Sequence, residues 1–189
     1  STASAETASV SAGWYGVSGG GIEITNLVDN TVDAALRGNL QVNTVGDIEI
    51  RADENSYLSA EAKSLTASFS LGAAVGASVV SNTAQSEIAA VIGDATVMSF
   101  GDVRVLANSN LDISNTDTVG VSGSLVGIAV NVASAEARNT VKAAIRDASV
   151  YADTGTVTVK AEADNKAQTS AKGGAVGALA VGAMVAETT

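Results

Sequence analysis

The sequence predicts an all-β fold: a β-solenoid, similar to a parallel β-helix, built from repeats of about 54 residues. A motif recurs in residues 30–52, 86–107 and 139–161, and the alanines that end its copies stand 55 and 54 residues apart. Self-similarity at a fixed spacing is typical of stacked units rather than of one globular core. The second observation is an apolar/polar alternation in the motif, and the third is a set of uncharged Gly/Ala-rich runs between its copies.

The second half of each motif copy is predicted to be a strand. Its apolar residues alternate with polar ones, which is the period of a half-buried strand, and Gly and Asp before it are typical of a turn. The apolar pairs on the inward face are Ile48 and Ile50, Val103 and Val105, and Val157 and Val159.

The first half of the motif fits either a strand or an amphipathic helix. Apolar residues between 141 and 148 recur at helical spacing. As a strand, Val141, Ala143 and Ile145 point inward and the chain turns at Asp147. The strand is favoured, because a ten-residue helix with an internal Gly or Asp is marginal and Val and Ile favour strands.

Uncharged runs follow the motif copies, in residues 64–86, 118–135 and 173–186. The first is long enough for a membrane helix, but its many Ser and Thr residues and the shortening of the later runs argue against one. Each internal Gly costs a helix about 0.5–1 kcal/mol, so long strands packed closely on another backbone layer are expected. We expect two or three coils per repeat. The alternative topology is a stack of long β-hairpins closed at Gly173 and Gly174.

The amino-acid composition excludes several classes of function. The net charge is -10, from 20 acidic and 10 basic residues, which is the wrong sign for a nucleic-acid binder. The chain has no Cys, His or Pro, which excludes nucleophilic triads and thiolate or imidazole metal sites. We expect residues 1–189 to form a single repeat array, a fragment of a longer chain, with no cofactor, metal, catalytic residue or membrane span.

Four local features suggest chemistry, and each has a simpler interpretation. Thr156 and Thr158 resemble the Thr rows of ice-binding solenoids, but charged residues replace them in the other copies. Gly46-Asp47 and Gly101-Asp102 resemble remnants of calcium loops, but the Gly-Gly-x-Gly-x-Asp string is absent, which favours a turn.

The other two features are an acidic-basic cluster and an aromatic pair. Asp147, Asp153 and Arg146 are the best carboxylate cluster for a polysaccharide-cleaving enzyme, but the other copies lack part of the set, and no enzyme is expected. Trp14 and Tyr15 are expected to cap the first apolar layer rather than to stack on carbohydrate.

The third copy reads Asn139-Thr140-Val141-Lys142-Ala143-Ala144-Ile145, then Asp147-Ala148-Ser149-Val150, then Gly155-Thr156-Val157-Thr158-Val159-Lys160-Ala161, before the run 173–186. This pattern resembles a repeat of very large bacterial surface proteins of the filamentous-haemagglutinin or adhesin type. The resemblance covers nearly the whole chain and implies a secreted, elongated β-solenoid at the bacterial cell surface, with no catalytic or binding residue. The extra residue between Leu36 and Val42, and Ser86-Glu87 in place of Asn-Thr, are interpreted as tolerated loops.

The expected function is therefore that of a structural or adhesive repeat segment of an extracellular bacterial filament. It would act as a stiff stalk that associates end to end through exposed strand edges. Its partners would be neighbouring repeats of the same protein, in a homo-polymer. The alternative is a β-solenoid module that binds host or cell-surface glycans along one face.

Overall fold

The computed structural model describes residues 2–12, 14–68 and 71–189. Within these residues it contains β-strands and no helix. The strands are β1 (Thr2–Ser11), β2 (Val17–Thr44), β3 (Ile48–Ser68), β4 (Ala73–Ser99), β5 (Val103–Gly123), β6 (Val126–Arg146), β7 (Ser149–Ala152), β8 (Val157–Val176) and β9 (Leu179–Thr188). The all-β prediction is confirmed, and both halves of the motif are strands.

The strands form two parallel sheets that face each other. Sheet A has the order β1-β3-β5-β8 and sheet B the order β2-β4-β6-β9, with β7 pairing to β4 beside the end of β6. Consecutive long strands lie in opposite sheets, and each pairs in parallel with the strand one repeat away. This arrangement is a β-solenoid, and the predicted alternative of stacked hairpins is wrong. Gly173 and Gly174 lie inside β8 instead of at a chain reversal.

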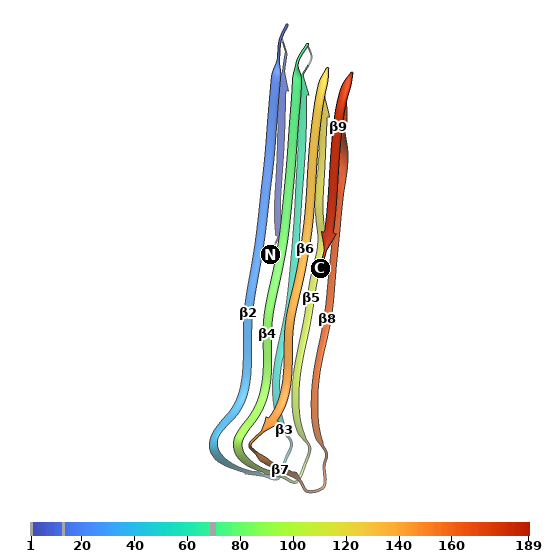
Figure 1. Ribbon diagram of the computed structural model, residues 1–189. Helices are drawn as coiled ribbons and strands as arrows, with labels where there is room; N and C mark the ends of the chain where they lie inside the picture. The colour runs from blue at the N-terminus through green and yellow to red at the C-terminus, as the bar shows by residue number, and fades with distance from the viewer. Residues whose placement is uncertain (1, 13, 69–70) are drawn as a thin grey trace.

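The pairing register superimposes the motif copies. Ile88 pairs with Val32 and Val141, and Val103 pairs with Ile48 and Val157. One repeat therefore forms one coil, and the expectation of two or three coils per repeat is wrong. The 21 residues of β5 span about 70 Å at about 3.3 Å per residue, whereas four stacked strands are only about 15 Å deep. The long axis of the molecule consequently runs along the strands (Figure 1).

The motif halves enclose the largest hydrophobic core. Its buried side chains in the central coil are Ile88, Ala90, Ile92, Ala95, Val97, Val103, Val105 and Ala107. Here the backbone bends at Asp94, whose φ is 49°, and at Asn39 and Asp147 in the neighbouring coils (Figure 1). The chain bends at Asp147, where a turn was predicted, but it does not reverse there, because β7 continues beside β4 in sheet B. The extra residue of the first copy is absorbed beside Gly38 as a register shift between Arg37 and Leu40, inside β2 instead of in a loop.

The opposite end of the molecule has small and polar residues between its sheets. Gly76 and Gly120 face the other sheet at close range, since a Cβ on Gly76 would lie 3.1 Å from Thr66 Oγ1 and one on Gly120 would lie 2.2 Å from Asn131 Oδ1. The close approach predicted from the Gly/Ala-rich runs is confirmed. Buried polar residues at this end are Ser64, Thr66, Ser68, Ser78, Thr116, Thr118, Ser122 and Asn131.

Candidate functional site

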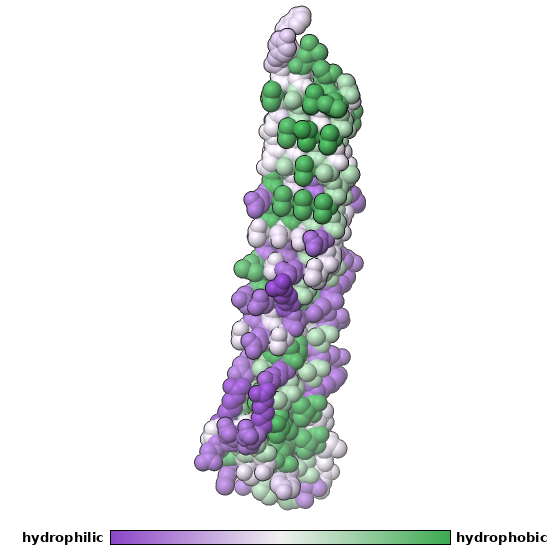
Figure 2. Space-filling view, in the orientation of Figure 1, coloured by the Kyte–Doolittle hydropathy of each residue, from purple (hydrophilic) through white to green (hydrophobic). Residues whose placement is uncertain are grey.

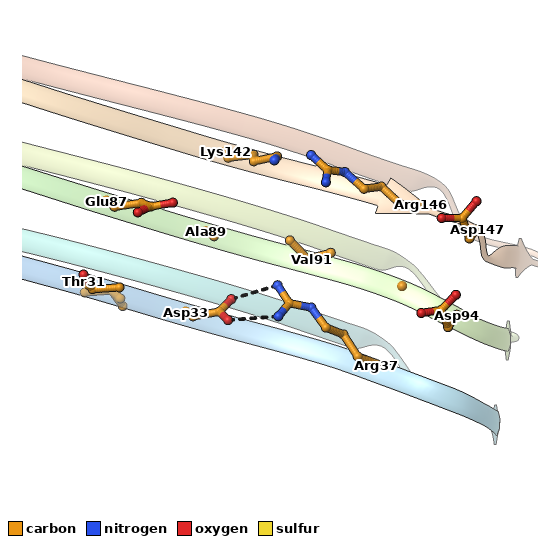
Figure 3. Close-up of a pocket in the computed structure, with 12 residues that line it drawn as sticks. Thr31, Asp33, Arg37, Glu87, Ala89, Val91, Asp94, Lys142, Arg146 and Asp147 are labelled. Carbon is orange, nitrogen blue, oxygen red and sulfur yellow. Dashed lines mark hydrogen bonds and ion pairs between the residues drawn. The ribbon is translucent and has the colours of Figure 1, made fainter.

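A groove on the outer face of sheet B lies beside the backbone bend (Figure 3). Its volume is about 330 Å³. Ala89, Val91 and Gly93 of β4 form the middle of its floor, with Glu87 and Asp94 at the two ends, while side chains of β2 and β6 border it. The borders are two strand spacings apart, about 10 Å. Long basic side chains on the outer coils thus flank a floor that is aliphatic in the middle and has a carboxylate at each end.

The two borders differ in whether their basic side chains form ion pairs. On β2, Arg37 forms a two-point ion pair with Asp33, with Nη1–Oδ2 and Nη2–Oδ1 distances of 3.2 and 3.3 Å. On β6, Lys142 and Arg146 lie on the same face, and Arg146 points back along the strand toward Lys142 (Figure 3). Neither forms an ion pair with any residue that the structure describes. This border can therefore bind an anion without first breaking an internal pair.

The structure divides the cluster considered for a polysaccharide-cleaving enzyme. Arg146 and Asp147 line the groove. Asp153 lines a different hollow, of about 530 Å³, together with Phe100 and Tyr151. The three side chains therefore do not meet in one pocket.

The turn aspartates bind the backbone of the next coil. Asp47 Oδ1 accepts a hydrogen bond of 2.8 Å from the N–H of Asp102, and Asp102 Oδ1 accepts one of 2.9 Å from the N–H of Thr156. The backbone hydrogen bond from Thr156, together with Arg104, holds the pKa of Asp102 below its ordinary value. The Gly-Asp pairs are therefore turns whose Asp side chains hydrogen-bond to the next coil, which explains them without a calcium loop. No group of three or more metal-ligating side chains occurs among the described residues.

The structure places the other two sequence features as follows. Thr158 pairs with Arg104, which pairs with Glu49, so the described coils contain no continuous row of Thr at this position. Trp14 and Tyr15 are 88% and 86% exposed at the reversal between β1 and β2. The prediction that they cap an apolar layer is wrong, because the adjoining interior is polar and offers no apolar layer to cover.

A buried carboxylate was missed by the sequence reasoning. Glu54 is 8% exposed and faces the interior from β3. Its oxygens accept hydrogen bonds from Ser56 (2.5 Å), Ser86 (2.9 Å), Ser109 (2.6 Å) and Asn30 (3.2 Å). Burial raises the pKa of Glu54, but the hydrogen bonds from Ser109, Ser56, Asn30 and Ser86 outweigh it, so the pKa lies below its ordinary value.

This network also changes the interpretation of Ser86. Ser86 lies inside β4 and is buried, so the departure from Asn-Thr in the second motif copy is not a loop. The signal in the sequence was the alternation itself. Glu54 follows Ile48, Ile50 and Ala52 at the same two-residue spacing and therefore falls on the inward face.

The last coil leaves core positions uncovered. Val157 and Val159 in β8 are 44% and 45% exposed, whereas their partners Val103 and Val105 in β5 are fully buried. The alternation predicted inward faces for all four valines. In β8 that face is only partly covered: β6 packs against β8, but β9 pairs with β6 only from Val126 to Ala135 and does not reach the end that holds Val157 and Val159.

Within the described residues there is no helix long and apolar enough to cross a membrane. Comparison of the chain with protein-family models, with curated proteins and with solved structures gave no match.

Proposed function

We propose that this chain is a structural or adhesive repeat segment of an extracellular bacterial surface protein or filament. In this proposal it acts as a stiff stalk and associates end to end. The location outside a bacterial cell rests on the resemblance of the motif to repeats of surface adhesins. The mechanical role rests on the fold.

Continuous pairing between coils supports stiffness. Each strand of the central coils is hydrogen-bonded on both sides to a neighbouring coil. Side chains add further links: Asn26 Nδ2 donates to Asn82 Oδ1 at 2.9 Å, and Asn108 Nδ2 donates to Asp53 Oδ1 at 2.8 Å. A coil cannot move relative to its neighbour without breaking many of these bonds together.

The exposed valines of β8 are the observation that most directly supports end-to-end association. Val157 and Val159 occupy core positions, and the backbone edge of β8 beyond them has no partner among the described strands. An added coil, from a second copy or from adjoining repeats, would bury these side chains and pair this edge. An unpaired strand edge beside apolar side chains is a template for such addition.

Sedimentation and electron microscopy at rising concentration test this proposal. We expect the chain to form end-to-end filaments, and we expect Val157→Gln with Val159→Gln to block them. The control is Thr158→Gln with Lys160→Gln, on the outward face of the same strand, which should assemble normally. A chain that stays monomeric at all concentrations, or equal assembly by both variants, would contradict end-to-end association.

Acidic-glycan binding in the groove is a second candidate function. The observation that favours it is the border formed by Lys142 and Arg146, which have no described ion-pair partner and lie four residues apart on one face. Carboxylate or sulfate groups along a polysaccharide could pair with both cations at once.

Calorimetric titration with alginate or heparin as the probe tests this function. We expect salt-sensitive binding that Lys142→Gln with Arg146→Gln reduces at least tenfold. Lys160→Gln with Lys166→Gln removes the same charge elsewhere and should leave binding unchanged. Equal loss in both double variants would show that only overall charge matters and would exclude the groove.

A further inference from the structure

The end of the molecule opposite the large core has its apolar side chains on the outside. We call this end the apolar cap and define it as the outward-facing side chains of residues 71–79, 125–132 and 179–185 in sheet B, with residues 65–67 and 121 in sheet A. Figure 2 shows hydrophobic residues gathered in rows over the upper part of this face, above a more hydrophilic middle part. None of the cap residues is charged.

Four rows of the cap run across sheet B in register. They are Ala73, Val126 and Leu179; Val75, Ile128 and Val181; Ala77, Val130 and Ala183; and Val79, Val132 and Val185. Several of the large members remain substantially exposed: Val75 is 42%, Val130 38%, Val181 55% and Val185 51% exposed, whereas Val79, Val126, Ile128 and Val132 are half-buried. Regular rows of Val, Ile and Leu on a flat sheet are what normally packs against a second sheet.

The interior of the cap cannot bury these side chains. Its inward positions hold Ser, Thr, Gly, Ala and Asn, and the two sheets approach closely at Gly76 and Gly120. The described inward residues 64–78 and 116–131 include no Val, Ile or Leu. The usual pattern of a solenoid, apolar inside and polar outside, is thus inverted here. The side chains of the apolar rows can therefore be removed from water only by a partner that packs on the outside of the coil.

The size of the face fits a second sheet of the same kind. Eight residues along the strands and the three strands β4, β6 and β9 across give a face of about 26 Å by 14 Å, or about 370 Å². Apolar patches of this size on a soluble chain mark interaction sites. Two such faces in contact would remove about 750 Å² from water, which is the size of a weak, concentration-dependent association. Each additional coil would enlarge the contact.

Charge and backbone hydrogen bonding favour a second copy of the chain over a lipid surface as the partner. The chain has a net charge of -10, yet the cap is uncharged, so two copies can meet there with the least repulsion. A lipid surface fits less well, because the outermost strands β1 and β2 have one edge without a described partner. Hydrocarbon cannot hydrogen-bond such backbone groups, whereas a water-exposed dimer leaves them solvated.

We propose that the apolar cap is a lateral docking surface for a second copy of this chain, with the sheet B faces of two caps packed against each other. This contact uses the outer face of sheet B, not the strand edges, and so does not depend on end-to-end association. Because burial of apolar area drives it and net charge opposes it, the association should strengthen as salt rises.

The test compares two triple variants by sedimentation equilibrium at low and high salt. The first variant, Val75→Thr with Val130→Thr and Val181→Thr, makes the sheet B face of the cap more polar. It retains β-branched residues, which are suited to strands. The matched control, Val45→Thr with Met98→Thr and Tyr151→Thr, changes three exposed apolar residues at the other end. We expect the wild type and the control to dimerise, more tightly in high salt, and the cap variant to associate at least tenfold more weakly.

A cysteine cross-link provides a second measurement, since the chain has no Cys. Val130→Cys should give a disulfide-linked dimer on mild oxidation, and Val45→Cys should not. The proposal is overturned if the wild type stays monomeric in high salt or if the cap variant and the control dimerise equally. It is also overturned if the chain binds phosphatidylcholine vesicles through the cap and does not dimerise, because the partner would then be lipid.

Discussion

The turn glycines Gly46, Gly101 and Gly155 illustrate how closely the coils are stacked. A Cβ on Gly155 would lie 2.5 Å from the carbonyl carbon and oxygen of Gly101. One on Gly101 would lie 2.2 Å from Asp47 Oδ1, while one on Gly46 would meet nothing within 4 Å. The same residue type thus has a different role in successive coils, set by whether another coil lies against it.

This difference predicts unequal costs for the same substitution. Gly155→Ala should lower the free energy of unfolding by about 2 kcal/mol or more, because the backbone of the adjoining turn must move. Gly46→Ala should change it by less than about 0.5 kcal/mol. Chemical denaturation of the two variants measures both values. Equal destabilisation would show that the turns are not stacked in this register.

Glu54 predicts a pH dependence of stability. A carboxyl group whose pKa is lowered by folding stabilises the fold above its unfolded pKa, and this contribution is lost as the pH falls through the folded value. Stability should therefore decrease as the pH drops below about 4.5, the ordinary pKa of the group. Glu54→Gln should cost about 1–2 kcal/mol at neutral pH, since an amide cannot accept all four hydrogen bonds. It should also weaken the acid dependence.

Denaturation curves between pH 3 and pH 7 measure this effect. Glu49→Gln is the matched control, because Glu49 is an exposed, outward-facing carboxylate in the same strand. If both variants retain the full acid dependence of the wild type, Glu54 does not contribute to it.

At the scale of the strands, the bend at Asp94 separates the two segments of β4 that line the core. Its φ of 49° is in the left-handed region, which Asp and Asn tolerate better than β-branched residues do. The same position is Asn39 in the first coil and Asp147 in the third, both at 49°. The recurrence of Asp or Asn at this point, between the two segments of the motif that lie in sheet B, follows from this backbone conformation.

Substitution at Asp94 should reveal the strain. Asp94→Val should destabilise the fold by about 1–2 kcal/mol, whereas Asp94→Gly should be neutral or slightly stabilising. Thr96→Val, two residues further on in extended backbone, is the control and should be close to neutral. Thermal unfolding of the three variants decides the matter. A neutral Asp94→Val would show that the bend does not require a left-handed residue.

Sequence periodicity predicted the strands, their inward residues and the register between copies, because alternation and repeat spacing are direct consequences of parallel stacking. It did not predict the number of coils. A strand that continues through an uncharged run has the same local pattern as two strands joined by a turn. The reversals also lack a uniform signal, since the reversal after β8 is Gly177-Ala178 while the one after β5 is Ser124-Leu125.

The candidate sites were predictable only in part. Arg146 and Asp147 were singled out from the sequence and do line a groove. For Lys142 the alternation of Val141, Ala143 and Ile145 implies only that its side chain faces outward. Whether Lys142 forms an ion pair depends on which acidic residues of the neighbouring coils lie close to it, and the sequence alone does not show this. The apolar cap was visible as uncharged runs, but which of its residues face outward depends on the phase of each strand.

For the whole molecule, long strands and a shallow stack predict an elongated particle. With a longest dimension of about 80 Å along the strands, a thin rod has a radius of gyration of about 23 Å. A compact domain of this length would have about 16 Å. Small-angle X-ray scattering at low concentration and low salt, where association is weakest, distinguishes the two. A value near that of a compact domain would contradict the open two-sheet solenoid.

The parallel, in-register pairing of whole coils also determines how the molecule would respond to being pulled. The coils follow one another along the chain, so the two chain ends lie at opposite sides of the stack. Tension between these ends pulls the coils apart and detaches the outermost coil first. Each detachment frees one repeat of about 54 residues, which extends to about 180–190 Å. A protein that contains such an array would therefore lengthen in equal steps under load. Each step would dissipate energy while the remaining coils keep their shape.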